Sequence, residues 1–349
     1  MISEMRAAVL HGARDIRIEQ IVRPELMPGM VLLRSRRVGI CGSDLHYFEE
    51  GKCAAFVPNQ PFVLGHEVTA EVMELADGAG SLKAGDRVTV NPARNCGFCE
   101  YCGTGRPNLC RKTIMLGSAS TTPPTNGALA DFVVVRADQC HALPGAIDDS
   151  LGAMMEPFAV ALQAVKRAGV ISGRRVLVTG AGTIGQLVAI TARAFGAVPV
   201  AISDIVAARR ENAVALGADC ALDPLQPELT ARVSELTGDG FDVIFEASGS
   251  PRALRSAFDL VRPSGTIVQI GTLGTEDIAI PANLLMNREI NFVGSMRYGN
   301  VFDEAIRLAA TGRVDLRPLI SGVFALERST EAFEQAADKS QSFKIQIEL

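Results

Sequence analysis

From about residue 174 to 271 the sequence alternates short apolar runs with segments whose apolar residues recur at helical spacing. The run "RRVLVTG" precedes "IGQLVAITARAFGA", and three more apolar runs follow, each separated from the next by an amphipathic segment. Buried strands that alternate with amphipathic helices are typical of a parallel, doubly wound sheet. This alternation therefore predicts an α/β domain over residues 157–294.

Three glycines at the first strand–helix junction, Gly180, Gly182 and Gly185, form the pattern G-x-G-x-x-G. Such glycines permit a tight turn, close approach of a pyrophosphate and close packing of helix on strand, although a sharp turn alone could also use them. Asp204 ends the next strand, where a carboxylate binds ribose hydroxyls and repels a 2′-phosphate. We therefore expect NAD rather than NADP, although the arginines that follow would suit a phosphate. The expected cofactor-binding positions are Gly180, Gly182, Thr183, Ile184, Gly185, Asp204, Arg209, Gly271, Leu273 and Arg297.

Residues 1–156 have a different pattern, in which short β-like runs are broken by glycine and proline. Examples are "MVLLRSRRVGI", "EVTAEVMEL" and "DFVVVRA". Many short strands at close spacing favour a barrel-like β domain. The tail, residues 295–349, contains two helical segments and ends in "FKIQIEL", which we expect to be a strand that returns to the first domain.

Four of the eight cysteines lie in one short lobe, about residues 94–112, with the spacing C-x2-C-x2-C-x7-C. Four thiolates fill the tetrahedral shell of Zn²⁺ and leave no position for water or substrate. The spacing therefore predicts a structural zinc site, with disulfides or an iron–sulfur cluster as the alternatives. The four ligands would be Cys96, Cys99, Cys102 and Cys110.

A second, sparser set of metal-binding residue types is spread over the first domain: Cys41, His66, Glu67 and Glu156. One thiolate, one imidazole and one carboxylate bind zinc and leave a position for water or an alcohol. Taken singly, each residue is more often a core, turn or surface residue. We interpret the remaining cysteines and two histidines as packing residues; they are Cys53, Cys140, Cys220, His11 and His141.

The charge and hydropathy patterns exclude several classes of partner. The net charge is -5 and no block of like charge occurs, which argues against a nucleic-acid surface. No apolar run reaches the ~18 residues of a membrane span, and the N-terminus has no apolar segment of the signal-peptide type. We therefore expect a cytoplasmic protein that acts on a small molecule.

Together these motifs resemble the zinc-dependent medium-chain dehydrogenases over the full length of the chain. The resemblance implies a GroES-like β-barrel catalytic domain and a Rossmann domain. A carboxylate at Glu156, where the alcohol dehydrogenase branch has a cysteine, is similar to the polyol branch that includes sorbitol dehydrogenases. The stretches that carry the resemblance are "GICGSDLHYFEEGK", "LGHE", "NPARNCGFCEYC", "EPFAVALQA", "VTGAGTIGQL", "FDVIFEASG" and "VGSMRY".

The resemblance implies two zinc ions per chain, one structural and one catalytic. The catalytic ion would be bound by Cys41, His66 and Glu67. Glu156 would lie beside it, either hydrogen-bonded to the zinc-bound water or exchanging as a ligand. The family pattern also implies a homotetramer, with a dimer as the alternative.

Two further positions, Ser43 and His46, match the family's proton relay. The stretches "GSDLHYFEEGK" and "LGSAS" are similar to L-idonate 5-dehydrogenases, so the expected reaction is oxidation of L-idonate to 5-keto-D-gluconate with NAD. Lys52 and Arg297 are candidates to bind the substrate carboxylate. The alternatives are a sorbitol or xylitol dehydrogenase, an L-threonine 3-dehydrogenase and, more distantly, a zinc-free quinone reductase relative or a non-enzymatic NAD-binding protein.

Overall fold

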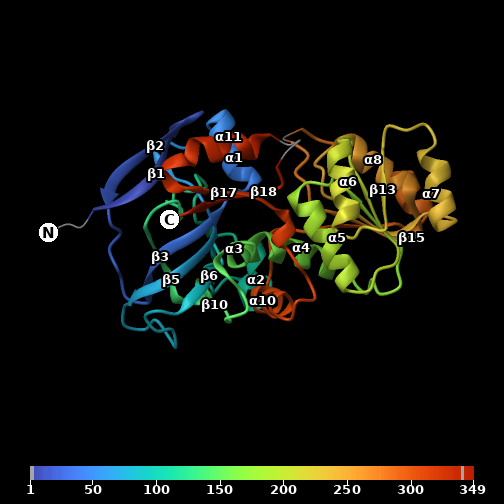
Figure 1. The fold of residues 1–349 in the computed structure, drawn as a ribbon. Coiled ribbons are helices and arrows are strands. Elements are labelled where there is room, and N and C mark those ends of the chain that lie inside the picture. The colour runs from blue at the N-terminus through green and yellow to red at the C-terminus, as the bar shows by residue number, and fades with distance from the viewer. Residues whose placement is uncertain (1–3, 275, 339–341) are drawn as a thin grey trace. The chain divides into compact units, whose positions relative to one another are not determined.

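The computed structural model describes residues 4–274, 276–338 and 342–349 (Figure 1). The chain forms two compact units. Unit 1 comprises Met1–Glu156 and Phe302–Leu349, and unit 2 comprises Pro157–Val301. Unit 1 is mainly β-structure and unit 2 is built on a parallel sheet, so the predicted α/β fold class is confirmed.

Unit 1 is built mainly from antiparallel strands. Its largest sheet has the order β10-β6-β5-β3-β18-β17, with β9 also paired to β3, and smaller sheets have the orders β2-β1-β4 and β7-β8. The C-terminal strand β18 pairs with β3 antiparallel and with β17 in parallel. The strands are β1 (Glu4–Gly12), β2 (Asp15–Val22), β3 (Met30–Gly39), β4 (Phe62–Val63), β5 (Glu67–Leu75), β6 (Arg87–Val90), β7 (Ala93–Arg94), β8 (Ile114–Met115), β9 (Phe132–Arg136), β10 (Cys140–Ala142), β17 (Ile320–Ala325) and β18 (Lys344–Glu348).

Apolar residues from distant parts of the sequence form the core of unit 1. Val31 and Leu33 of β3 are fully buried, and Ile347 of β18 joins the same cluster. The ring of Phe48 lies 5.2 Å from that of Phe333, which joins the first helix of the unit to its last. The C-terminal segment therefore supplies part of the hydrophobic core on which the β-domain depends.

Short helices connect the strands of unit 1. Two of these helices, α3 and α4, follow one another and meet at Met154. The carboxylate of Asp148 caps α3 by accepting a hydrogen bond of 2.8 Å from the Leu151 N–H. The helices are α1 (Gly42–Glu50), α2 (Glu100–Gly103), α3 (Asp149–Ala153), α10 (Phe302–Ala310) and α11 (Ser329–Ala337), while α4 (Met155–Arg167) runs from unit 1 into unit 2.

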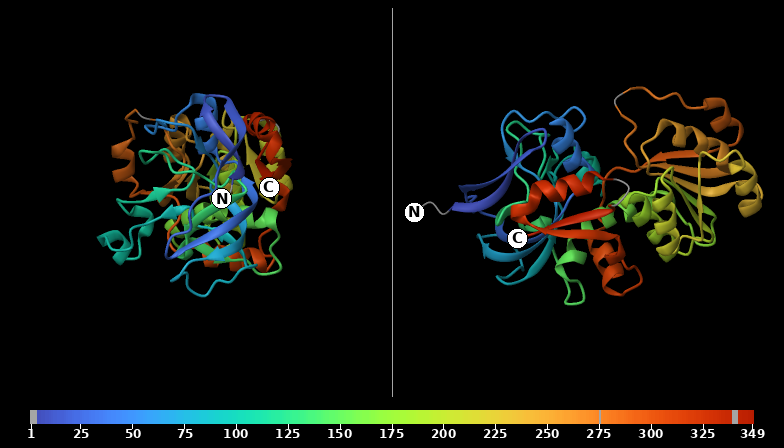
Figure 2. Two further views of the ribbon diagram at one scale, coloured as in Figure 1. Left: turned by 90° about the vertical axis from the view of Figure 1, so that its left-hand side faces the viewer. Right: turned by 45° about the horizontal axis from the view of Figure 1, so that its top comes forward.

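Unit 2 is a six-stranded parallel sheet of order β13-β12-β11-β14-β15-β16, with helices on both faces (Figure 2). The strand order reverses at β11, and open α/β sheets bind their ligands at the carboxyl ends of the strands beside such a reversal. Its elements are β11 (Val176–Thr179), α5 (Thr183–Ala194), β12 (Val200–Ser203), α6 (Ala207–Ala215), β13 (Cys220–Leu222), α7 (Leu229–Thr237), β14 (Phe241–Glu246), α8 (Pro251–Leu260), β15 (Val261–Gln269), α9 (Ala282–Asn287) and β16 (Asn291–Gly294).

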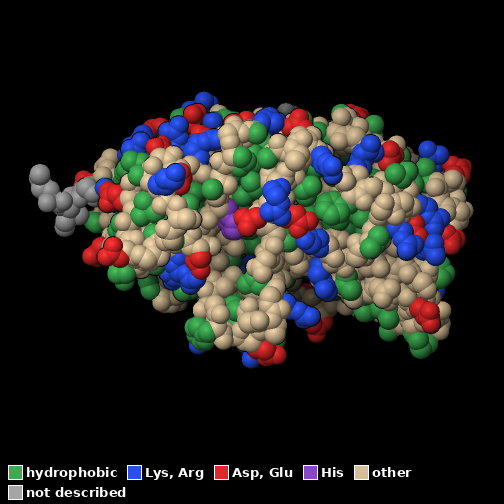
Figure 3. Space-filling view, turned by 90° about the horizontal axis from the view of Figure 1, so that it is seen from below, with side chains coloured by type: hydrophobic (Ala, Val, Ile, Leu, Met, Phe, Trp, Pro, Cys, Tyr) green, Lys and Arg blue, Asp and Glu red, His purple; other side chains and the backbone are tan. Residues whose placement is uncertain are grey.

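The surface mixes charges of both signs. On the face drawn in Figure 3, basic and acidic side chains are interspersed. Within the part of the chain that the structure describes, no helix has both the length and the apolar character to cross a membrane.

Candidate active site and dinucleotide site

The first candidate site is built around Asp44 in unit 1. Cys41 occupies the N-cap of α1, and its backbone N–H donates to Asp44 Oδ2 at 3.0 Å. Asp44 Oδ1 lies 3.5 Å from His66 Nδ1 and accepts a 3.4 Å hydrogen bond from the Gly65 N–H. Since the Asp44 side chain is only 1% exposed, it joins the start of α1 to the turn that carries His66.

That turn requires glycine at position 65. Gly65 has a φ of +93°, a region that residues with a Cβ rarely adopt. A Cβ at Gly65 would also lie 2.8 Å from a methyl carbon of Val38 and 2.9 Å from Leu129 Cγ. The sequence "LGHE" therefore encodes a tight turn that delivers His66, buried, to the start of β5.

The surroundings of His66 favour positive charge. Burial opposes protonation of the ring, but the neighbouring Asp44 and Cys41 outweigh it and raise the pKa of His66 well above its ordinary value. A half-buried thiol, a buried carboxylate and a buried imidazole thus lie together in unit 1. This set of groups can stabilise a cation.

Glu67 is held by a buried lysine. Lys344 Nζ donates to both carboxylate oxygens of Glu67 at 2.6 Å and to the Ile40 carbonyl at 2.9 Å. The two side chains are 1% and 3% exposed. Gly39 makes room for this pair, because a Cβ there would lie 2.1 Å from Glu67 Oε2. Both charges are therefore fully paired inside unit 1.

Glu156 lies close to the same lysine. It is buried in the first turn of α4. Burial lowers the pKa of Lys344, but the charges of Glu67, Cys41 and Glu156 offset it, and the pKa of Lys344 is raised. The four residues that the sequence proposes for a catalytic metal therefore surround one region of unit 1, with Lys344 and Asp44 among them.

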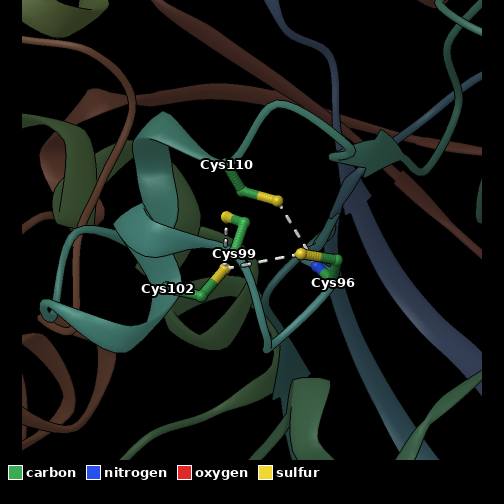
Figure 4. Close-up of side chains that lie close together, drawn as sticks. All are labelled: Cys96, Cys99, Cys102 and Cys110. Atoms are coloured by element: carbon green, nitrogen blue, oxygen red, sulfur yellow. Dashed lines mark hydrogen bonds between the residues drawn. The ribbon is translucent and has the colours of Figure 1, made fainter.

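The four-cysteine lobe is the more compact of the two candidate metal sites, and Figure 4 shows its four cysteine side chains close together. The sulfur atoms of Cys96, Cys99, Cys102 and Cys110 all lie within 4.8 Å of one another. Among the described residues this is the one group of three or more potential ligands that meets this distance limit, so Cys41, His66, Glu67 and Glu156 do not meet it as placed. Bonds of ~2.3 Å from a tetrahedral zinc put its sulfurs ~3.8 Å apart. The cysteine lobe already approximates that shape.

The surroundings of the lobe shift the pKa values of its thiols in opposite directions. The Cys110 sulfur accepts 3.4 Å hydrogen bonds from the N–H groups of Cys96 and Lys112. These bonds outweigh burial and lower the pKa of Cys110 to about 6. Burial and the neighbouring thiols raise the pKa of Cys102 to about 12, so the cluster does not lose its four protons together.

The proposed proton-relay residues lie on α1. Ser43 is half-buried in its first turn, whereas the side chain of His46 is 59% exposed and its Nδ1 lies 3.0 Å from Glu50. Lys52, just beyond the helix, is exposed. Cys53 packs against the core as expected, but it also lies near the site, since burial and then Cys41 raise its pKa.

The glycine loop of unit 2 has the geometry of a dinucleotide fingerprint. Gly180 has a φ of +89°, and a Cβ there would lie 2.7 Å from Ser248 Cα. A Cβ on Gly185 would lie 1.8 Å from the Gly180 carbonyl oxygen, so helix α5 packs directly on the turn. Gly182 is the N-cap of α5, and the N–H groups of such a helix end bind anions.

Asp204 closes this loop against the next strand. Its Oδ2 accepts a 2.8 Å hydrogen bond from the Ala181 N–H, and its Oδ1 accepts one of the same length from the Val206 N–H. Arg209 Nη1 lies 3.9 Å from Asp204 and 3.7 Å from the point where a Cβ of Gly182 would be. The aspartate and the arginine thus flank the glycine loop.

The remaining predicted cofactor positions are spread over unit 2. Thr183 and Ile184 are half-buried in the first turn of α5. Gly271 follows β15, and Leu273 packs partly against the core of the unit. Arg297 is half-buried and has a φ of +47°.

Comparison with known proteins gives this geometry a family. Residues 183–311 match the family model described as zinc-binding dehydrogenase, and residues 27–145 match the alcohol dehydrogenase GroES-like domain. The sorbitol dehydrogenase of Gallus gallus is 38% identical, covering 98% of this chain and 95% of the relative. The chain belongs to the zinc-dependent medium-chain dehydrogenases. It is an enzyme of the alcohol and polyol dehydrogenase type.

Two further comparisons describe the similarity of this dehydrogenase to known proteins. The sorbitol dehydrogenase of Bacillus subtilis is 33% identical, covering 98% of this chain and 97% of the relative. A crystal structure of L-idonate 5-dehydrogenase from Escherichia coli is 31% identical, with a TM-score of 0.93 over 100% of this chain and 99% of that one. The family and the fold that the sequence motifs predict are therefore confirmed.

Sequence reasoning missed the part that two residues, Lys344 and Asp44, play in the candidate active site. Lys344 lies 277 positions from Glu67 in the sequence. One sequence signal was available: Lys344 and Gln346 alternate with two isoleucines in the last strand. If such a strand is buried, its polar side chains need polar partners inside the protein. All four residues are buried in the structure.

Proposed function

We propose that this dehydrogenase oxidises the C5 hydroxyl of L-idonate to 5-keto-D-gluconate with NAD as the hydride acceptor. The observation that carries the proposal is the grouping of half-buried Cys41 with buried Asp44 and His66, in which Asp44 contacts both the Cys41 N–H and the His66 ring. A dinucleotide loop in unit 2 supplies the second requirement for hydride transfer.

The donor set fits a catalytic zinc. Cys41 and His66 offer one thiolate and one imidazole, and Glu67 or Glu156 offers a carboxylate, which leaves one position for substrate. Lys344 holds both oxygens of Glu67, so the choice between the two carboxylates stays open. Zinc bound here would act as a Lewis acid that lowers the pKa of the substrate alcohol, while NAD would accept the hydride.

The proton released from the alcohol needs a route to water. Ser43 and His46 are three residues apart on α1, a spacing that places both on one helix face. Ser43 is half-buried and its hydroxyl can both accept and donate a proton. The His46 side chain is exposed and its imidazole can accept and donate a proton, so it can pass the proton to solvent.

We propose NAD rather than NADP because of Asp204. Its carboxylate is buried beside the glycine loop, and each oxygen keeps acceptor capacity after bonding one backbone N–H. A 2′-phosphate would be repelled there. Arg209 offers the opposing attraction, so the ratio of kcat/KM for the two cofactors measures which charge prevails.

The substrate carboxylate requires a cation, for which we propose Lys52. This residue is exposed just after α1, the helix that begins at Cys41. Lys52→Ala should raise the KM for L-idonate about tenfold and leave the KM for sorbitol unchanged, because sorbitol has no charge to pair. Equal changes for both substrates would point instead to Arg297 or to another group.

The four-cysteine lobe would hold a second, structural zinc. Its sulfurs are near tetrahedral spacing, and four thiolates leave no open position. We further propose a cytoplasmic homotetramer, as the family resemblance implies, and light scattering on the purified protein would distinguish it from a dimer.

One experiment tests the proposal as a whole. The purified enzyme is assayed with L-idonate, D-gluconate, sorbitol, xylitol and L-threonine, each with NAD and NADP, and its zinc content is measured in parallel. We expect the highest kcat/KM for L-idonate with NAD and two zinc ions per chain. Preference for sorbitol or xylitol would establish the polyol alternative, which the 38% identity to a sorbitol dehydrogenase supports.

A further inference from the structure

A fully buried carboxylate lies at the end of β14 in unit 2. Glu246 is 0% exposed. Its Oε1 accepts hydrogen bonds from the Ser248 N–H at 2.9 Å, from the Ser248 hydroxyl and from the Gly249 N–H at 3.1 Å. Its Oε2 accepts a 2.6 Å hydrogen bond from Gln269 Nε2 on the neighbouring strand. Every one of these partners is electrically neutral.

This arrangement differs from that of two other buried acids, which are paired with cations. Glu67 is paired with Lys344, and Asp242 is flanked by Arg175 and Arg262. Neutral donors solvate the charge of Glu246 but do not cancel it, so its electric field extends into the surroundings. A buried charge without a paired cation lowers the stability of the folded state, so local packing alone does not account for it.

The position of Glu246 on the sheet places its charge near one half of a bound dinucleotide. β14 and β12 flank β11, which carries the glycine loop, and Asp204 follows β12. If the adenosine binds on the side of Asp204, the other half of the dinucleotide extends over β14. The loop is close to the Glu246 network, since Gly180 packs against the backbone of Ser248.

The same network shapes the following loop. A Cβ on Gly271 would lie 2.4 Å from the Gly249 nitrogen and 2.8 Å from Glu246 Oε2. Gln269 Nε2 also donates to the Gly271 carbonyl at 2.7 Å. The turns after β14 and β15 therefore pack on the carboxylate itself, and anything bound over them is close to its charge.

We propose that the buried charge of Glu246 makes unit 2 prefer the oxidised cofactor, because it stabilises the positively charged nicotinamide of NAD⁺ and has no such effect on the neutral ring of NADH. This electrostatic role rests on the proposed NAD site. It favours binding of the cofactor form that is needed for alcohol oxidation, and it acts through a residue of unit 2 whose hydrogen bonds go to protein groups.

Glu246→Gln tests the charge with the shape retained. Gln269 Oε1 has no hydrogen-bond partner among the described residues. A flip of the Gln269 amide would let this oxygen accept a bond from the new side-chain amide, at the cost of the bond to Gly271. The variant therefore removes the charge and can keep the contact between the two strands.

The measurement is the dissociation constant of NAD⁺, of NADH and of ADP-ribose for the full-length enzyme and for Glu246→Gln, by calorimetry and NADH fluorescence. We expect NAD⁺ to bind about tenfold more weakly to the variant, as for one charge roughly 12 Å away at an effective dielectric constant of about 20. NADH and ADP-ribose should change less than about twofold. Equal weakening of NAD⁺ and NADH would show a purely structural role and overturn the proposal.

Two controls keep the result interpretable. If the unmodified enzyme does not bind NAD⁺, the proposed function fails, whereas an unchanged NAD⁺/NADH ratio in a variant that binds ADP-ribose normally overturns only the role of Glu246. If Glu246→Gln does not fold, Ser248→Ala serves instead. It leaves the carboxylate and removes one exposed donor, so the preference for NAD⁺ should increase; a constant or smaller preference contradicts the proposal.

Discussion

The two candidate metal sites of unit 1 differ in how their donor atoms are brought together. The lobe takes four sulfurs from one short stretch, and they lie within 4.8 Å of one another. The other site draws on Cys41, His66, Glu67 and Glu156, which come from three separate parts of the sequence and do not meet that distance limit as placed. There Asp44 and Lys344 also engage the donors.

This difference separates a site that can only bind a structural metal from a site that could also bind a substrate. Four thiolates complete a tetrahedral shell, so the lobe can stabilise a loop but offers no place for a substrate. The scattered site mixes a thiol, an imidazole and carboxylates. Asp44 contacts His66, and Lys344 holds Glu67, so these groups are positioned without an ion. A site of this second kind depends on the integrity of the whole β-domain. Variants at the two sites should therefore fail in different ways.

The largest contrast is expected at Cys41. Cys41→Ser replaces a thiolate ligand by a poor one, so kcat/KM should fall about a thousandfold or more while NAD binding is retained. Steady-state kinetics and calorimetry with NAD check the two parts separately. A parallel loss of turnover and of NAD affinity would contradict the assignment of Cys41 to the catalytic metal.

Lys344→Met should produce the largest loss of stability. It leaves Glu67 buried without its cation, which costs about 3–5 kcal/mol. Urea unfolding at pH 7 measures the change. The double variant Lys344→Met with Glu67→Gln is the matched control, because it removes both charges and should recover much of the loss. If the double variant were no more stable than Lys344→Met, charge pairing would not explain the effect.

Cys99→Ser should affect the lobe alone. The sulfur of Cys99 lies 3.5 Å from that of Cys102, and loss of one thiolate should release the structural metal. We expect one zinc fewer per chain and roughly 2–4 kcal/mol less stability, with turnover per folded molecule nearly unchanged. Metal analysis alongside active-site titration would test this. A stable, folded and inactive protein would reverse the division of roles.

The same contrast explains how much of the molecule the sequence could predict. The cysteine lobe and the glycine loop depend on short-range spacing, so both could be proposed from local patterns such as Gly180, Gly182 and Gly185. The strands of the parallel sheet were equally local signals. Short elements with weak periodicity escaped detection, among them α1, which begins just after Cys41, and the edge strand β16.

Long-range pairs could not be predicted in this way. Nothing near Glu67 in the sequence points to Lys344, and their pairing depends on β18 lying beside β3. Gly39 makes room for the pair, but a glycine in a strand has several possible causes. The candidate ligands of the catalytic metal could be listed by residue type, but only the family resemblance joined them into one site, because Cys41 and Glu156 share no local pattern.

The smallest expected effect concerns the framework of the scattered site. Asp148 caps α3, the helix that precedes Glu156, and Asp148→Ala should lower the free energy of unfolding by about 1 kcal/mol and leave the cysteine lobe unaffected.

Burial raises the pKa of Asp148, but the Leu151 N–H and Arg317 outweigh it and lower the pKa. The contribution of a carboxylate with a lowered pKa is present above its ordinary value near 4 and is lost as the pH falls through the folded-state value. The stability gap between the wild type and Asp148→Ala should therefore close below about pH 4, as measured by urea unfolding. Asp148→Asn keeps a capping oxygen and should lose less than Asp148→Ala at pH 7; equal losses would assign the effect to charge and not to the cap.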